Sequence, residues 1–232
     1  MSGPSEDLAV ESRSVAIINV HGIGTPERRL DEGEEQAWVS VRQFEQVLDA
    51  VAKRPDARIT FDDGNASDVE IALPRLVERG LVAEFFLLAG ELGDPGRVDR
   101  AGVRALLDAG MAIGSHGWSH RNWRRIDDAA ARDEYYRAVQ VLGELTGQPV
   151  SRVAIPFGSY DRHVLRRLRA AGVTRAYTSD GGRARPDAWL QPRTSLRHNI
   201  DGAWIAQVLD PGTSLMRRAR DNVALAAKRW RG

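Results

Sequence analysis

The stretch "ARITFDDGNASDVEIALPRLVERGLVAEFFLL", residues 57–88, changes its pattern twice within a short length of chain. An apolar run at 57–63 is typical of a strand, the segment from Ser67 to Gly80 has the signals of a helix, and another apolar run follows at 82–88. A strand, a helix and a strand in this order form the repeating unit of a parallel sheet covered by helices. The stretch therefore predicts an α/β fold.

The same alternation continues along most of the chain. We expect strands at 15–21, 57–63, 82–88, 111–115, 152–156 and 173–179, and helices at 39–53, 67–80, 99–110, 127–146 and 161–171. Ser40 with Gln43, and Ser67 with Glu70, have the spacing of capping boxes, and Pro74 is expected to kink its helix. With about seven such units, a closed or nearly closed barrel is favoured over an open sheet.

Composition indicates one ordinary globular domain. The chain has 232 residues, of which 42% are hydrophobic and 28% charged. We expect a flexible segment at 1–14, a barrel at 15–210 and a basic helix at 211–232. A net charge of +1 gives no reason to expect a nucleic-acid partner. Because the chain has no cysteine, His, Asp and Glu are the only strong metal ligands that it offers.

Nothing in the sequence predicts a membrane span. No apolar run approaches the ~18 residues that a spanning helix needs, and the first residues lack the basic and apolar regions of a signal peptide, so we expect a cytoplasmic protein. The C-terminal "LMRRARDNVALAAKRWRG" has six basic residues and one acidic residue. It is expected to pack on the barrel, and peripheral contact with an anionic membrane is the less favoured alternative.

Two acidic residues, Asp62 and Asp63, stand where the strand at 57–63 meets Gly64. Successive side chains on a strand point to opposite faces, so two neighbouring carboxylates should not normally share a pocket. A break of the strand at Gly64 would let both tilt toward the barrel mouth, where the active sites of such barrels lie. The alternative is a solvated turn built from Asp63, Gly64 and Asn65.

A histidine pair follows another expected strand. In "GSHGWSHRNW", residues 114–123, His116 and His120 are four positions apart and can converge on one ion. Two capping or surface histidines beside a packed Trp118 are the alternative. One carboxylate and two imidazoles leave coordination positions open, which is the pattern of a catalytic metal.

Together, "TFDDG" (60–64), "SHGWSH" (115–120) and "PFGSYD" (156–161) resemble the three ordered motifs of the polysaccharide deacetylase family, the NodB-like carbohydrate esterases of family 4. The resemblance spans about residues 15–200. It implies a distorted (β/α)7 barrel that holds a divalent metal, usually Zn²⁺ with Co²⁺, Ni²⁺ or Mn²⁺ as alternatives. It also implies hydrolysis of an N-acetyl group on a carbohydrate or sugar-conjugate substrate.

The resemblance assigns roles to individual residues. It implies that Asp63, His116 and His120 hold the metal and that Asp62 is the general base. Pro156, Phe157 and Gly158 would form the groove wall, with the Phe157 N–H as an oxyanion donor. Tyr160 would either stack on the sugar or pack at a helix start.

Several positions depart from the family pattern. The arginine that pairs with the base is replaced by Ala154, and Arg152 or Arg193 could take its place. Asp180 lies where the fourth motif should be and is a turn residue or an orienting carboxylate. The general acid of the family is a late histidine, which His198 in "SLRH" (195–198) matches, and His21 is its rival.

The leading function is a metal-dependent deacetylase acting on N-acetylhexosamine units. Two alternatives stay open: an amidohydrolase for a small cyclic amide or ureide, and a catalytically silent sugar-binding barrel. The departures motivate the second alternative. Retention of Asp62 beside the three expected ligands argues against it.

Overall fold

The structure of the protein is a computed structural model that describes residues 14–210. The expected flexible N-terminal segment, apart from Ser14, and the expected basic C-terminal helix lie outside the described residues, so both stay predictions. Among residues 14–210, no helix has the length and apolar character to cross a bilayer.

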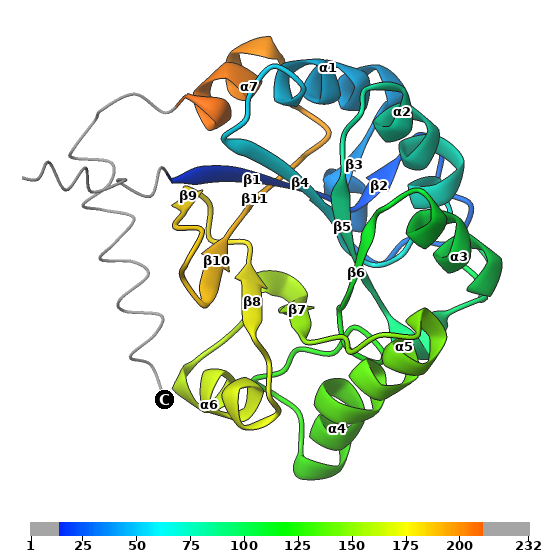
Figure 1. The fold of residues 1–232 in the computed structure, drawn as a ribbon, viewed down its shortest axis with the longest axis vertical. Coiled ribbons are helices and arrows are strands. Elements are labelled where there is room, and N and C mark those ends of the chain that lie inside the picture. The colour runs from blue at the N-terminus through cyan, green and yellow to red at the C-terminus, as the bar shows by residue number, and fades with distance from the viewer. Residues whose placement is uncertain (1–13, 211–232) are drawn as a thin grey trace, which may run out of the picture.

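A nine-stranded, mostly parallel sheet forms the wall of the barrel (Figure 1). Eight strands lie in the order β10-β8-β7-β6-β5-β4-β1-β11 and pair in parallel, and the ninth, β9, pairs antiparallel with β1. Their bounds are β1 Val15–Val20, β4 Ala57–Phe61, β5 Ala83–Leu87, β6 Ala112–Ser115, β7 Arg152–Ala154, β8 Arg175–Thr178, β9 Arg183–Ala184, β10 Leu190–Pro192 and β11 Thr194–Ser195. The expected nearly closed barrel is thereby confirmed.

The seam of the barrel lies at a single residue. The path of paired strands ends with β10 on one side and β11 on the other, and only Arg193 separates these two strands in the sequence. A smaller pair, β2 (Gly22–Ile23) and β3 (Trp38–Val39), stands apart from this sheet. The sequence patterns did not predict β2, β3, β9, β10 or β11, which have two or three residues each.

Helices surround the strands on the outside, as Figure 1 shows. They are α1 Val41–Val51, α2 Leu73–Glu78, α3 Arg100–Asp108, α4 Asp128–Arg132, α5 Ala138–Thr146, α6 Arg162–Ala170 and α7 Gly202–Leu209. Short 3-10 turns lie at Glu34–Ala37 (η1), Ala89–Glu91 (η3) and Pro156–Gly158 (η5), and π-helical turns lie at Asp68–Ala72 (η2) and Asp133–Arg137 (η4).

The capping box at Ser40 and Gln43 forms as expected and starts α1. The box expected at Ser67 and Glu70 is wrong. Ser67 has helical backbone angles, and its hydroxyl accepts a hydrogen bond from the Ile23 N–H at 3.3 Å instead of capping its own helix. Pro74 lies in the first turn of α2, directly after η2, where a missing N–H is tolerated.

An apolar layer fills the middle of the barrel. It contains Val15, Ile17, Phe86, Ala154, Tyr177 and Ala184, all of them buried. A larger core lies between the sheet and the outer helices, where the rings of Phe61 and Phe85 stack at 4.4 Å between centroids. Phe61 is the last residue of β4, so this stacking fixes the position from which Asp62 and Asp63 leave the sheet.

Candidate active site

A cavity of about 340 Å³ opens beyond the carboxyl ends of the strands. His21 follows β1, Asp62 and Asp63 follow β4, His116 follows β6, and Phe157 lies in η5 after β7; all of these line the cavity. The carboxyl ends of parallel strands meet at one face of a barrel, so residues far apart in sequence converge there.

Three lining residues have an unusual backbone. Within 14–210, the only non-glycine residues with positive φ are Asp63 (75°), His120 (51°) and Phe157 (58°). This left-handed region is costly for residues other than glycine and is enriched at functional sites. At Asp63 it explains how two neighbouring carboxylates enter one cavity, because the strand alternation is broken at Asp63 itself and not only at Gly64.

The side chains of Asp63, His116 and His120 converge on one point. Asp63 Oδ1 lies 3.3 Å from His116 Nε2 and 3.5 Å from His120 Nε2, and the three donor atoms lie within 4.8 Å of one another. Asp63 Oδ1 is buried and has no hydrogen-bond partner. A buried carboxylate oxygen without a partner, facing two imidazole nitrogens, fits a divalent cation with nitrogen and oxygen ligands.

The His116 ring is held in one orientation. Its Nδ1 donates to the carbonyl of Ala154 at 2.9 Å, which leaves Nε2 with its lone pair toward Asp63. Hydrogen bonds of this kind orient imidazole ligands in metal sites. Ala154 therefore contributes its backbone at the position where the family has an arginine.

Arg193 takes the place of that arginine. Its Nη1 donates to Asp62 Oδ1 and its Nη2 donates to Asp62 Oδ2, each at 2.7 Å, and both residues are buried. Asn19 Nδ2 donates to Asp62 Oδ2 at 2.9 Å, and Asn19 Oδ1 accepts from Arg193 Nη1 and from Thr60 Oγ1. Arg152 lies elsewhere, with its Nε 2.7 Å from Glu84 Oε1.

These contacts determine the protonation of the cluster. Burial alone would raise the pKa of Asp62, but the charge of Arg193 outweighs it and the pKa lies below its ordinary value. The pKa of Asp63 is likewise lowered, because its interactions with the nearby His116 and His120 rings outweigh burial. Burial lowers the pKa of His120, whereas for His116 the charge of Asp62 outweighs burial and raises the pKa.

A buried glutamate, Glu134 of η4, holds the loop between the two histidines. Its carboxylate accepts from the N–H groups of Trp118 and Ser119, from Ser119 Oγ and from Trp123 Nε1, at 2.9–3.1 Å. A Cβ at position 117 would approach Glu134 Oε2 to 2.1 Å, so Gly117 is required there. The Glu134 carboxylate thus holds the loop that carries His120 in one conformation.

Of the remaining expected site residues, some line the cavity and others lie outside it. His21 lines the cavity, and its buried Nδ1 has no hydrogen-bond partner among residues 14–210. His198 is exposed and does not line this cavity. Its Nδ1 lies 3.3 Å from the Gln36 carbonyl oxygen. Phe157 is 61% exposed and its ring lies 4.3 Å from the His120 ring. Pro156 is buried, and its neighbours Ile155, Phe157 and Gly158 line the cavity.

Tyr160 does not offer its ring to a sugar. The ring is buried in a core cluster, and its hydroxyl donates to Asp180 Oδ2 at 2.7 Å. Of the two alternatives for Tyr160, the structure shows packing at the start of α6. Asp180 is accordingly a partner of this tyrosine.

Sequence reasoning missed Asn19, Thr60 and Glu134. A polar residue inside the apolar run "VAIINVH" was a signal for Asn19, because a buried amide needs hydrogen-bond partners. Thr60 lies opposite Asn19 in the β1–β4 register, which only the pairing of the strands reveals. Glu134 lies on an ordinary amphipathic helix and gave no signal.

Comparison with known proteins agrees with this geometry. The family model of the polysaccharide deacetylases matches residues 49–176, which are more than half of the 232 residues. The peptidoglycan-N-acetylglucosamine deacetylase of Bacillus cereus is 24% identical over 131 residues, which cover 55% of this chain and 46% of that protein. YxkH of Bacillus subtilis is 22% identical over 138 residues, 58% of this chain and 50% of that one. The chain thus spans about half the length of these curated relatives.

Solved structures show the same fold. The Streptococcus pyogenes deacetylase PplD, in complex with acetate, superposes with a TM-score of 0.74 at 17% identity, covering 86% of this chain and 100% of that one. A polysaccharide deacetylase from Bacillus cereus also gives 0.74, at 19% identity, over 85% of this chain and 69% of that one. The barrel, the ordered motifs and the family match agree: the chain belongs to the polysaccharide deacetylase family.

Proposed function

We propose that the protein is a metal-dependent hydrolase that removes the acetyl group from an N-acetylhexosamine unit of a glycan or glycan precursor. The observation that carries this proposal is the convergence of Asp63, His116 and His120 beside a second carboxylate, Asp62, that is not part of the cluster. Membership of the polysaccharide deacetylase family, and the peptidoglycan deacetylase among the relatives, support the choice of an N-acetylated sugar.

The fit of the three side chains to a divalent cation rests on the orphaned Asp63 oxygen and on the orientation of His116. Asp63, His116 and His120 would hold the cation, and zinc is the first choice for such a donor set. When bound, a cation of this kind lowers the pKa of a coordinated water and polarises the acetamide carbonyl.

Asp62 is proposed to take the proton of the attacking water. Because Arg193 keeps the pKa of Asp62 low, the carboxylate is ionised and ready to accept a proton at neutral pH. The bidentate contact with Arg193 and the bond from Asn19 also fix the direction of the carboxylate. Water adds to the acetyl carbon, the C–N bond breaks, and the products are acetate and a free amine.

The amine must receive a proton as it leaves, and His21 is the candidate donor. Its ring lines the cavity, and its Nδ1 is free of hydrogen-bond partners within the described part of the chain. The backbone N–H of Phe157, in a left-handed conformation at the cavity wall, is proposed to face the developing oxyanion.

Acetate release from N-acetylglucosamine oligomers tests the proposal, together with metal analysis of the purified protein. Chelation should abolish release and added Zn²⁺ should restore it. Asp63→Ala should lose the metal, whereas Asp62→Asn should keep the metal and lose turnover by about 10²–10⁴-fold. Release that persists without metal, or metal retained by Asp63→Ala, would contradict it.

A further inference from the structure

A second, larger cavity of about 610 Å³ opens at the opposite end of the barrel. Its lining includes the first or second residue of five strands: Arg58 of β4, Glu84 of β5, Ala112 of β6, Arg152 of β7 and Arg175 of β8. Strand starts lie at the amino end of a parallel barrel, whereas Asp62, Asp63 and His116 follow strand ends. The two cavities therefore belong to different faces of the molecule.

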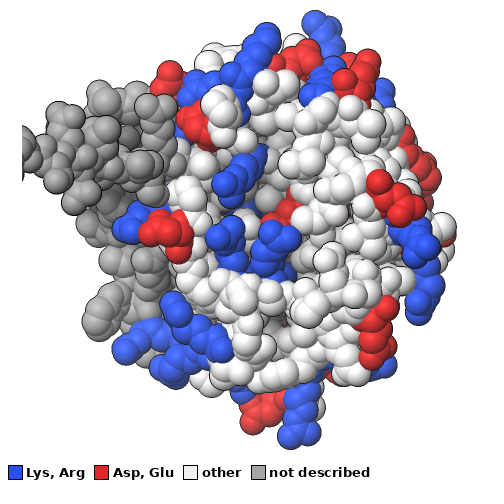
Figure 2. Space-filling model, viewed as in Figure 1, with Lys and Arg blue, Asp and Glu red and all other residues white. Residues whose placement is uncertain are grey.

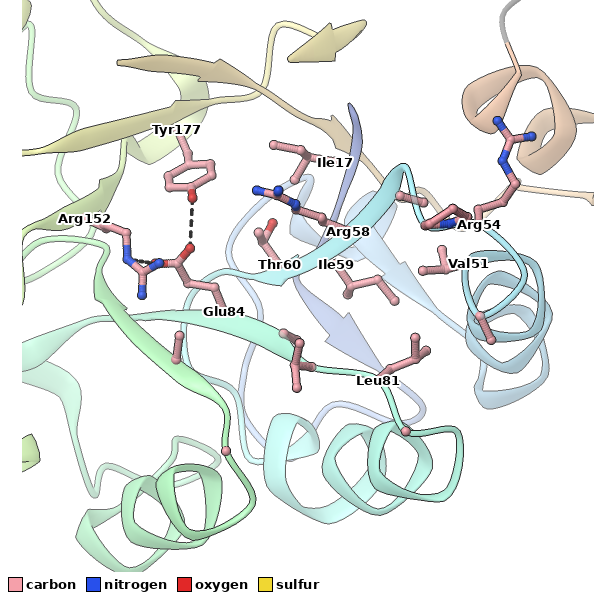
Figure 3. Close-up of a pocket in the computed structure, with 18 of the residues that line it drawn as sticks. Ile17, Val51, Arg54, Arg58, Ile59, Thr60, Leu81, Glu84, Arg152 and Tyr177 are labelled. Carbon is pink, nitrogen blue, oxygen red and sulfur yellow. Dashed lines mark hydrogen bonds and ion pairs between the residues drawn. The ribbon is translucent and has the colours of Figure 1, made fainter. Parts of the chain in front are cut away.

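The barrel interior separates the two cavities. Phe86 and Tyr177 lie in the central apolar layer, and the Arg193 guanidinium lies over their rings at 5.3 and 5.6 Å from the centroids. The Tyr177 hydroxyl points the other way and donates to Glu84 Oε2 at 2.9 Å (Figure 3). Tyr177 thus contacts Arg193 with its ring and faces the second cavity with its hydroxyl.

Positive charge is in excess in the second cavity. Figure 2 shows Lys and Arg side chains around a hollow near the middle of the face that it presents. Four arginines, Arg54, Arg58, Arg152 and Arg175, and Lys53 line the cavity with a single carboxylate, Glu84. Arg152 and Arg175 are direct partners in the β7–β8 register, an arrangement of like charges that destabilises a sheet unless an anion compensates.

Glu84 compensates only Arg152 among these arginines, and Arg54 pairs with Asp56. Glu84 Oε1 lies 2.7 Å from Arg152 Nε, and Glu84 Oε2 accepts from the Tyr177 hydroxyl, so both oxygens of this carboxylate are already engaged. Arg175 Nη2 donates to the neutral carbonyl of Pro186 at 3.0 Å. Arg58 has no hydrogen bond or ion pair with any residue of 14–210, and Figure 3 shows it extending from β4 across the pocket in the direction of Tyr177.

We propose that this cavity binds a phosphate-bearing small molecule, with Arg58 and Arg175 as the ligands of the phosphate group. The planar fork of a guanidinium matches phosphate oxygens and forms short, charge-assisted hydrogen bonds. The volume lies within the range of small-molecule pockets. Leu81 and Val82 supply an apolar side to the pocket, which suits the body of a phosphate ester. The site is independent of the proposed deacetylation and uses none of its residues.

Calorimetric titration of the full chain tests the proposal at constant ionic strength, with three probes: glucose 6-phosphate, inorganic phosphate and glucose. Both phosphate probes should bind and glucose should not. Tighter binding of glucose 6-phosphate would identify an ester as the ligand, and equal binding would identify the inorganic ion. Arg58→Gln should weaken binding roughly tenfold, and Arg58→Gln with Arg175→Gln should abolish it.

Two controls separate this site from other sources of binding. Arg104→Gln removes the same charge from α3, where the side chain is 78% exposed, and should bind within about twofold of wild type. Asp63→Ala changes only the candidate active site and should also bind normally. No heat from either phosphate probe up to ~10 mM, unchanged binding in the double variant, or loss of binding in Asp63→Ala would overturn the proposal.

Discussion

Arg193 and Asp62 form two parallel hydrogen bonds of 2.7 Å each across 131 positions of sequence. Arg193 is also the single residue between β10 and β11, where the barrel closes. The residue at the seam of the barrel is therefore also the one that keeps the proposed base ionised. A guanidinium fork is needed for both contacts, because a single point charge cannot bind two oxygens in parallel.

Arg193→Lys should keep the charge and lose the fork. We expect the free energy of unfolding to fall by about 1–3 kcal/mol and turnover to fall by about tenfold or more, because Asp62 loses one fixed contact. Urea unfolding and acetate release measure the two effects. Arg185→Lys, at an exposed ion pair with Asp187, is the matched control and should change neither quantity. A fully active, equally stable Arg193→Lys would show that the bidentate geometry is not required.

The same pair predicts how stability depends on pH. The pKa of Asp62 is lower in the folded protein than the ~3.9 of an unfolded chain. Such a group stabilises the fold fully above the unfolded pKa, and this contribution is lost as the pH falls through the folded pKa. The difference in unfolding free energy between wild type and Asp62→Asn should thus be constant from about pH 7 to pH 5 and shrink below about pH 4. Urea unfolding of metal-free protein across this range measures it; a difference that widens toward acid would have the wrong sign.

The sequence predicted those features that depend on local pattern. Strand and helix periodicities indicated the barrel, and residues directly after strands, such as Asp63 and His116, were expected to meet because strand ends share one face. Features that depend on tertiary contacts were not predictable. Ser67 has the spacing of a capping residue, but its hydroxyl accepts a hydrogen bond from the Ile23 N–H instead. Asn19 and Thr60 meet because β1 and β4 pair in one particular register, which the sequence alone does not reveal.

Glu134 was not predicted from the sequence either, and the contribution of its hydrogen bonds to metal binding can be tested. Glu134→Gln keeps the shape but replaces an acceptor oxygen with an amide that cannot accept, so at least one of the four donors on the loop loses its partner. We expect metal affinity to fall about 10–100-fold, as it does when groups that orient metal ligands are removed. Competition with a chelator measures this affinity.

Ser119→Ala is the control for Glu134→Gln. It removes only the side-chain donor and leaves the two backbone donors and Trp123 in place, so metal affinity should stay within a few-fold of wild type. Wild-type affinity in Glu134→Gln, in a protein with an unchanged unfolding transition, would show that the loop keeps its shape without this carboxylate.

The two candidate acids can be separated by paired substitutions. His21 lines the candidate active site, whereas His198 is exposed and its ring lies beside the Gln36 carbonyl. His21→Ala should therefore lower turnover by about 10²–10⁴-fold while metal content stays at the wild-type level, because a proton donor is lost and no ligand is changed. His198→Ala should stay within about twofold, as expected for an exposed side chain away from the reacting groups. A substrate with a better leaving group than an amine should restore much of the activity of His21→Ala, since it needs less protonation. The reverse pattern, with His198→Ala inactive and His21→Ala active, would transfer the acid to the residue that the family motif indicates.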